Sequence, residues 1–452
     1  MKKALPLCAL ILALLAVAFS LGPVPPVDTQ LTAIQLPADL DRYLTETEAP
    51  YPDITPGAEK TIVWAHPDQR QTDLAIIYLH GYSATRQETA PLSDQLARQL
   101  GANLFYTRLS GHGRSGAAMA EASVQDWLQD SQEALQIGQR LGKQVLVIGT
   151  STGATLATWL ALQGDNPQVL AYIMVSPNFA PKDPAATVLT WPWATHFVPL
   201  LLGPEHQWQP RNAEQARYWS HRYPVQALLP MMALVKYVRE QPLEQISAPI
   251  LTLYSQDDQV VSAPAIEAAF ARFGSPHKQL IALKDTQDPS HHVLAGDILS
   301  PQDTPRVQAA ILAMGAAQRE EPVWRYWLAR SLEVQGRQKP ARELYLETAN
   351  LRGFYGFMAA QRTGVPYRIK NQSVGHKVPD WRTASSRWPF LVRVRELLAM
   401  NEITAARADF RRNEAGVVVA LSKGSIQTRS LMGAGEEPVK KTSRASLRLL
   451  GS

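Results

Sequence analysis

The chain has 452 residues, 45% of them hydrophobic and 19% charged, and its formal net charge is +5. This balance is ordinary for a globular protein, so it excludes an intrinsically disordered chain, and the length allows two or three domains. The excess of positive charge is too small to indicate a nucleic-acid partner, and we expect none.

The N-terminus carries the pattern of a secretory signal. Residues 1–3 (Met-Lys-Lys) precede an uncharged, mostly apolar run over residues 4–21. This pattern predicts either a signal peptide over residues 1–22, cleaved near 16–18 (Ala-Val-Ala), or an uncleaved anchor in the inner membrane. Either way we expect an exported protein, periplasmic or secreted. The single cysteine, Cys8, lies in this segment, so the exported chain is expected to have no disulfide and no zinc–thiolate site.

A proline-rich lead over residues 23–54 is predicted to be a linker. Beyond it, apolar strand-like segments alternate with helical patterns, such as the one over 123–141 that places Trp127, Ala134 and Ile137 near one face. This alternation predicts an α/β domain over about 55–316, with a mostly parallel sheet covered on both faces. The predicted strands are 61–65, 74–79, 103–106, 144–148, 170–175, 249–254 and 278–283.

Residues 178–245 interrupt this alternation and are predicted to be a helical cap insertion over the end of the sheet. An apolar cap would suit an acyl chain, although some of its side chains must pack the cap onto the sheet. The apolar residues of this segment are Trp191, Trp193, Phe197, Leu200–Leu202, Trp208, Trp219, Leu228, Leu229, Met231 and Met232.

From about Thr304 onward the pattern is helical only. Residues 321–336 and 340–352 each place aromatic, leucine or alanine side chains on one stripe, and paired short helices of this kind stack to bury their stripes. The sequence therefore predicts a small all-α helical-hairpin segment over 319–415. Residues 416–452 have no sustained period and are predicted to be a disordered tail.

Residues 145–157, VLVIGTSTGATLA, contain the first candidate for chemistry. An apolar run leads into Ser151, which is flanked by glycines and followed by a helix of small residues. The stretch predicts a strand, a sharp turn and a helix, with the serine at the tip of the turn. A serine that only caps a helix would give the same pattern, so a nucleophile must be supported by partners elsewhere in the chain.

A catalytic serine needs a base, and the base needs an acid that orients it. In a parallel sheet these groups are expected in loops at the carboxyl ends of later strands. The next-to-last predicted strand is followed by Asp257 and Asp258, and the last one by His291 and His292. Asp285 also follows the last strand and is a distant alternative acid. The order serine, aspartate, histidine is the one found in α/β-hydrolases.

Three further motifs match this family. His80-Gly81-Tyr82 resembles its oxyanion loop, residues 108–115 (RLSGHGRS) resemble its glycine-rich turn, and residues 255–261 (SQDDQVV) resemble its acid loop. Residues 55–316 thus resemble an α/β-hydrolase of the serine esterase or lipase type.

The resemblance implies a role for each group. Ser151 would be the nucleophile, His292 the base and Asp258 the acid, while the backbone N–H groups of Tyr82 and Thr152 would bind the oxyanion. Asp257 and His291 remain the neighbouring alternatives. The implied function is hydrolysis of short- to medium-chain esters or monoacylglycerols, for which no cofactor is needed.

Two other histidines, His80 and His112, are expected to be structural and to donate to loop backbone. A metal site is not expected, because the adjacent His291 and His292 point in different directions and no H-E-x-x-H spacing occurs.

Residues 319–415 resemble a second family, the helical region of soluble lytic transglycosylases, through 323–329 (VWRYWLA), 352–362 (RGFYGFMAAQR) and 392–398 (VRVRELL). The catalytic motif of that family does not follow, so no glycan-cleaving activity is expected. The alternative function is therefore a peptidoglycan-binding or scaffold protein with a vestigial hydrolase domain. A weak contact with peptidoglycan is the one partner that this segment suggests. The other interpretation, which we favour, is a passive remnant of a gene fusion or of a shifted reading frame.

Overall fold

The computed structural model describes residues 17–164, 166–319, 337–351 and 354–366, together with 325–326, 329–330, 333, 392 and 396. Cys8, the predicted tail 416–452, most of the predicted signal or anchor and much of the segment 319–415 lie outside these residues. The chain divides into two compact units, Met1–Met314 and Gly315–Ser452. Among the described residues, none belongs to a helix with the length and apolar character needed to cross a membrane.

A seven-stranded sheet is the centre of the described part of the first unit, in the order β1-β3-β2-β4-β5-β8-β9. All neighbouring strands are parallel except β1, which pairs antiparallel with β3. The α/β fold with a mostly parallel sheet is therefore confirmed. The strands are β1 (Thr61–Val63), β2 (Thr72–Leu79), β3 (Asn103–Tyr106), β4 (Gly142–Thr150), β5 (Val169–Val175), β8 (Ile250–Tyr254) and β9 (Lys278–Ala282).

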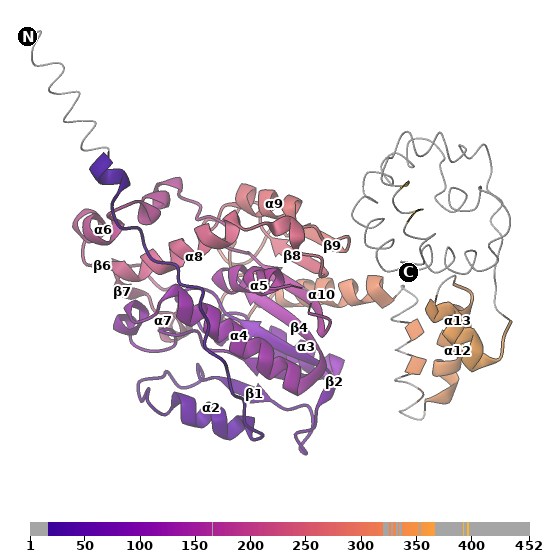
Figure 1. The fold of residues 1–452 in the computed structure, drawn as a ribbon. Helices are drawn as coiled ribbons and strands as arrows, with labels where there is room; N and C mark the ends of the chain where they lie inside the picture. Colours follow the sequence, from indigo (N-terminus) through magenta and orange to yellow (C-terminus); the bar gives the residue numbers. More distant parts are fainter. Residues whose placement is uncertain are drawn as a thin grey trace, which may run out of the picture. The chain divides into compact units, whose positions relative to one another are not determined.

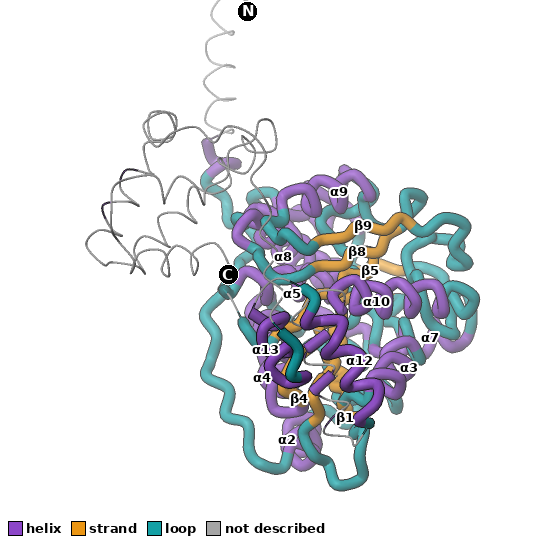
Figure 2. The backbone as a smooth tube through the Cα atoms, turned by 90° about the vertical axis from the view of Figure 1, so that its right-hand side faces the viewer, coloured by secondary structure: helices purple, strands orange, loops and turns teal. Residues whose placement is uncertain are grey.

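Helices cover both faces of this sheet, as Figures 1 and 2 show. On one face α4, α5, α8 and α9 pack in one apolar cluster, and on the other α3 and α10 pack in a second. The described α-helices that begin in this unit are α2 (Leu40–Glu48), α3 (Leu92–Leu100), α4 (Val124–Leu141), α5 (Thr152–Leu162), α6 (Ala194–Leu202), α7 (Ala213–Tyr218), α8 (Leu228–Glu240), α9 (Ala263–Arg272) and α10 (Thr304–Arg319). Short 3-10 helices are η1 (Arg86–Glu88), η2 (Gly116–Ala120), η3 (Pro184–Thr190), η4 (Val225–Ala227) and η5 (Leu243–Gln245).

Helix α4 illustrates how sequence sets these elements. Ser123 accepts the backbone N–H of Asp126, whose carboxylate accepts the N–H of Ser123 in return, so the first turn is capped at both donors. The stripe predicted from Trp127, Ala134 and Ile137 is fully buried against the sheet. Packing of this stripe thus fixes the helix on its face of the sheet.

The cap lies between β5 and β8 and contains α6, α7 and α8. It also contains a small antiparallel pair, β6 (Glu205–Gln207) and β7 (Arg222–Pro224), which the sequence pattern did not predict. Each strand has only three residues, of which two are exposed in β6 and one in β7, so neither gives the apolar alternation of a longer strand.

In the second unit, the described helices are α12 (Gln338–Ala349) and α13 (Phe354–Thr363). Tyr326, Tyr345, Ala349 and Ala359 form part of a separate apolar cluster in this unit. The predicted partner helix over 321–336 lies largely outside the described residues.

Candidate active site

Ser151 occupies the sharp turn between β4 and α5. Its backbone has φ +52° and ψ −116°, a conformation that residues with a side chain rarely adopt. A Cβ on Gly149 would lie 2.5 Å from the carbonyl oxygen of Gly153, and one on Gly153 would lie 2.0 Å from that of Leu79. Only glycine fits at either position, which explains the small residues around the serine.

Asp258 and His292 are joined by a hydrogen bond of 2.8 Å between a carboxylate oxygen and the imidazole Nδ1. The other carboxylate oxygen accepts the backbone N–H groups of Val260 and Val261 at 2.7 and 2.9 Å. Asp258 is fully buried. Both of its oxygens are therefore fixed by the loop after β8, and the carboxylate holds the imidazole in one tautomer.

The electrostatics of His292 reflect this pair. Burial disfavours the imidazolium, but the negative charge and hydrogen bond of Asp258, with smaller contributions from Asp288 and Glu88, raise the pKa of His292 above its ordinary value. The imidazole is thus a stronger base than a free histidine while its Nε2 remains available to a nucleophile.

The neighbouring alternatives lie elsewhere. The side chain of Asp257 is exposed to solvent, and the Nδ1 of His291 lies 2.8 Å from the hydroxyl of Thr286. Asp285 is also exposed, as expected for a surface residue. The structure therefore brings Asp258 together with His292 and neither Asp257 nor Asp285.

The two residues predicted to bind an oxyanion lie on segments that meet at the serine. Thr152 is the first residue of α5, where a backbone N–H has no acceptor within the helix. Tyr82 follows Gly81, and a Cβ on Gly81 would lie 3.2 Å from the Cβ of Ser151. Glycine at 81 therefore lets the oxyanion loop approach the nucleophile closely.

Asp288 holds the histidine loop, a role that the sequence analysis missed. One of its oxygens accepts the backbone N–H groups of His292 and Val293 at 3.1 and 2.9 Å, and the other accepts that of Ser290. The hydroxyl of Ser176, after β5, donates to the carbonyl of His292. The Asp-Pro-Ser stretch at 288–290 is a turn signal that could have indicated this role.

Glu88 was missed as well, and it lies at the junction of two site segments. Its carboxylate accepts the backbone N–H of Gly81 at 2.6 Å and the hydroxyl of Tyr78 at 2.8 Å. The same hydroxyl lies 3.0 Å from that of Thr150, the residue before the serine. Burial raises the pKa of Glu88 to about 7, against the opposing effect of these donors. No sequence motif marks this glutamate.

Ser151, His292, Tyr82 and Glu88 line one cavity of about 470 Å³ beneath the cap. Its apolar wall includes Trp208, Trp219, Leu228 and Met231, four of the predicted cap residues. The other predicted residues divide into three groups. Leu229 and Met232 are buried in the core, Phe197 is half-buried against it, and Trp191, Trp193 and Leu200–Leu202 are exposed. Polar cap side chains that also line the cavity are His206, Gln209, Arg211 and Gln215.

Comparison with known proteins shows which proteins this domain is similar to. Residues 70–288 match the family model described as "Serine aminopeptidase, S33". These residues form an α/β-hydrolase domain. A stretch of 229 residues, half of this chain, is 24% identical to the thermostable monoacylglycerol lipase of Bacillus sp. (strain H-257) and covers 86% of that protein.

Two further similarities are to a solved structure and to a protein that matches 101 residues of this chain. A solved structure of metagenome-derived lipolytic enzymes, LipS and LipT, has a TM-score of 0.49 and 21% identity, covering 58% of this chain and 99% of that one. The soluble lytic murein transglycosylase of Escherichia coli (strain K12) is 37% identical over 101 residues, which are 22% of this chain. The matched stretch spans 15% of the transglycosylase, so this chain covers only a small part of that relative.

Two buried histidines support the loops of the α/β-hydrolase domain. The Nδ1 of His80 lies 2.9 Å from the carbonyl of Gly81, and its Nε2 accepts the N–H of Leu109 at 3.0 Å. His112 contacts the carbonyl of Ser110 through its Nδ1. Burial lowers the pKa of both, to about 4 for His112, so both are neutral near pH 7.

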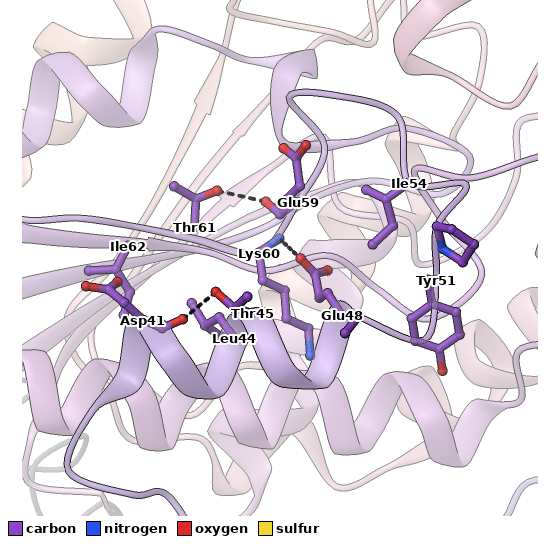
Figure 3. Close-up of a pocket in the computed structure, with 12 residues that line it drawn as sticks. Asp41, Leu44, Thr45, Glu48, Tyr51, Ile54, Glu59, Lys60, Thr61 and Ile62 are labelled. Atoms are coloured by element: carbon purple, nitrogen blue, oxygen red, sulfur yellow. Dashed lines mark hydrogen bonds between the residues drawn. The ribbon is translucent and has the colours of Figure 1, made fainter.

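A second cavity, of about 480 Å³, lies between α2 and the strand β1 (Figure 3). The carboxylate of Glu48 there accepts the backbone N–H of Lys60 and pairs with Arg108 at 2.6 Å. The Lys60 ammonium pairs with Glu133 of α4. The contacts of Glu48 fasten α2 to the α/β-hydrolase domain, and the Lys60–Glu133 pair joins the segment before β1 to α4. Within the described residues, no cluster of three or more histidine or acidic side chains could hold a metal ion.

Proposed function

We propose that the α/β-hydrolase domain is a serine carboxylic-ester hydrolase that acts through an acyl-enzyme on short- to medium-chain esters or monoacylglycerols. The observation that carries the proposal is the 2.8 Å hydrogen bond between Asp258 and His292, with Ser151 in a strained turn on the same cavity. The similarity to the monoacylglycerol lipase of Bacillus sp. supports an ester substrate.

In the proposed mechanism, the hydroxyl oxygen of Ser151 attacks the ester carbonyl carbon while His292 takes the hydroxyl proton. The carbonyl oxygen becomes an oxyanion, which the N–H groups of Tyr82 and Thr152 bind; such donors typically contribute about 3 kcal/mol each. His292 then gives its proton to the leaving alcohol, and an acyl ester remains on Ser151. Water attacks this ester with His292 as base, which releases the carboxylic acid and restores the serine.

The cavity wall favours an apolar acyl group. Trp208, Leu228 and Met231 provide a flexible apolar surface, while Gln209 and Arg211 provide donors for the polar end of an ester. A monoacylglycerol combines both features, an acyl chain and a hydroxylated head.

The test is hydrolysis of p-nitrophenyl acetate, butyrate, octanoate and decanoate by the wild type and Ser151→Ala. The variant is expected to lose activity by about 10⁴-fold or more, because the nucleophile is gone. Ser115→Ala is the matched control, since that exposed serine makes no capping hydrogen bond. Full activity in Ser151→Ala would exclude the proposal.

Peptidoglycan binding is a second candidate, favoured by the 37% identity to a murein transglycosylase over 101 residues. It would act beside the hydrolase and requires no serine chemistry. Co-sedimentation of the full chain and of Ser151→Ala with murein sacculi tests it: equal retention of both is expected. If neither protein is retained, this candidate is excluded.

A further inference from the structure

The cap carries an exposed apolar surface that the proposed chemistry does not use. Three consecutive leucines at the end of α6, Leu200–Leu202, have exposed fractions of 87%, 67% and 51%. Trp191 and Trp193, just before this helix, are 47% and 40% exposed. Helix α6 (ATHFVPLLL) contains no aspartate, glutamate, lysine or arginine. Folded domains rarely leave so many large apolar side chains together in water without a partner for them.

The N-terminal segment extends this surface. Phe19 and Leu21 are also exposed, and the ring of Phe19 packs edge-on against Trp191 with 6.1 Å between centroids. The indole N–H of Trp193 donates to the carbonyl of Ala18 at 3.1 Å. We name these residues together the apolar cap face: Phe19, Leu21, Trp191, Trp193 and Leu200–Leu202. Figure 1 shows the first described residues beside α6.

The apolar cap face adjoins the wall of the active-site cavity. Helix α6 ends at Leu202, and β6 begins three residues later at Glu205. His206, in β6, lines the cavity together with Ser151 and His292. A partner bound to the apolar cap face would therefore lie next to the part of the cap that lines the active-site cavity.

The sequence before this face indicates what covers it. Residues 4–21 contain no charge and follow two lysines, so the chain that reaches the cap at Ala18 is itself suited to lipid. Tryptophan side chains such as Trp191 and Trp193 favour the boundary between acyl chains and water. We infer that the apolar cap face docks on a lipid bilayer and presents the cavity to acyl esters dissolved in it. The substrate part of this inference rests on the proposed ester hydrolysis, whereas the docking does not.

The docking is tested with a fluorophore on the cap itself. In full-length Cys8→Ser, a single cysteine introduced by Leu201→Cys is labelled with the environment-sensitive dye NBD, and Val63→Cys, on β1, is the matched control. Val63 is 37% exposed and lies on another part of the domain. With vesicles of phosphatidylethanolamine and phosphatidylglycerol, a blue shift and a rise in emission are expected at 201 and not at 63. Both variants keep residues 1–16, so any tethering by that segment is common to the two measurements.

Two results would overturn the docking. Equal responses at positions 201 and 63 would mean that the cap does not enter the bilayer. A dye at 201 that is already blue-shifted without vesicles would mean that protein, either this chain or a second copy, covers the face.

A second variant tests the consequence for turnover. Replacing all three leucines, Leu200→Asp, Leu201→Asp and Leu202→Asp, removes apolar groups that face solvent, so p-nitrophenyl butyrate hydrolysis is expected to be unchanged. Hydrolysis of a monoacylglycerol carried in vesicles is expected to fall by about tenfold or more, because less enzyme is bound. An unchanged rate on vesicles would refute the link between docking and turnover. If the wild type hydrolyses neither ester, the proposed function fails, while the dye still decides the docking.

Discussion

Replacing Glu88 with glutamine tests how a buried carboxyl beside the site affects folding. Burial raises the pKa of Glu88 from 4.5 to about 7. Between these values the folded state binds more protons than the unfolded state, so the free energy of unfolding falls as the pH rises through this window. At 1.36 kcal/mol per pKa unit, the loss is about 3 kcal/mol and is complete above pH 7. Glutamine does not ionise, so Glu88→Gln would not lose this free energy of unfolding as the pH rises.

The assay is urea unfolding of the wild type and Glu88→Gln at pH 5 and pH 9. The stability of the variant relative to the wild type is expected to rise by about 3 kcal/mol from the lower to the higher pH. Glu267→Gln is the matched control, because that exposed carboxylate accepts the Tyr254 hydroxyl away from the cavity. A relative stability of Glu88→Gln that is equal at both pH values would refute the reasoning.

The same variant has a second readout in the ester assay. The negative charge of Glu88 contributes to the raised pKa of His292, so its removal is expected to shift the acid limb of kcat/KM to lower pH. A purely structural role for Glu88 would lower the rate without moving this limb.

Three other outcomes are expected. Asp258→Asn should lower kcat by about 10⁴-fold, because the amide cannot hold the same imidazole tautomer, whereas Asp257→Asn should leave it unchanged; equal losses in the ester assay would contradict the assignment. Gly153→Ala should lower the Tm by several degrees at least, since its Cβ would lie 2.0 Å from the carbonyl oxygen of Leu79, and calorimetry showing an unchanged Tm would disprove this close approach. In the wild type, kcat/KM should fall as the pH drops through the raised pKa of His292, because protonation removes the base; a pH profile flat down to pH 5 would argue against that role.

The parallel sheet was predictable because buried parallel strands leave a strong signal. Strands such as β4 and β5 are covered on both faces and appear as continuous apolar runs between helical patterns. The positions of Ser151 and His292 followed from the order of strands and loops, since the carboxyl ends of parallel strands share one edge.

The remaining features of the site depend on which side chains come close together in the folded chain, and sequence patterns do not give these distances. Asp257 and Asp258 are adjacent residues of the same type, and they differ only in that the loop buries Asp258 against the imidazole. Glu88 accepts the backbone N–H of Gly81, a donor that every residue except proline carries, so spacing along the chain gives no sign of this role. For Asp288, which accepts the N–H of Val293, the turn signal at 288–290 was the only indication. In the cap, likewise, the apolar composition did not show which residues line the cavity and which, such as the three leucines, are exposed.

Two backbone hydrogen bonds attach the start of the cap to the acid loop. The N–H of Lys182 donates to the carbonyl of Val260 at 2.9 Å, and the N–H of Ser262 to that of Ala180 at 2.8 Å. The cap is one uninterrupted insertion between β5 and β8, so evolution or a protein engineer could exchange it beyond residue 182 as a module. Such chimaeras would inherit an intact serine, histidine and aspartate from the host and take their substrate range from the donor.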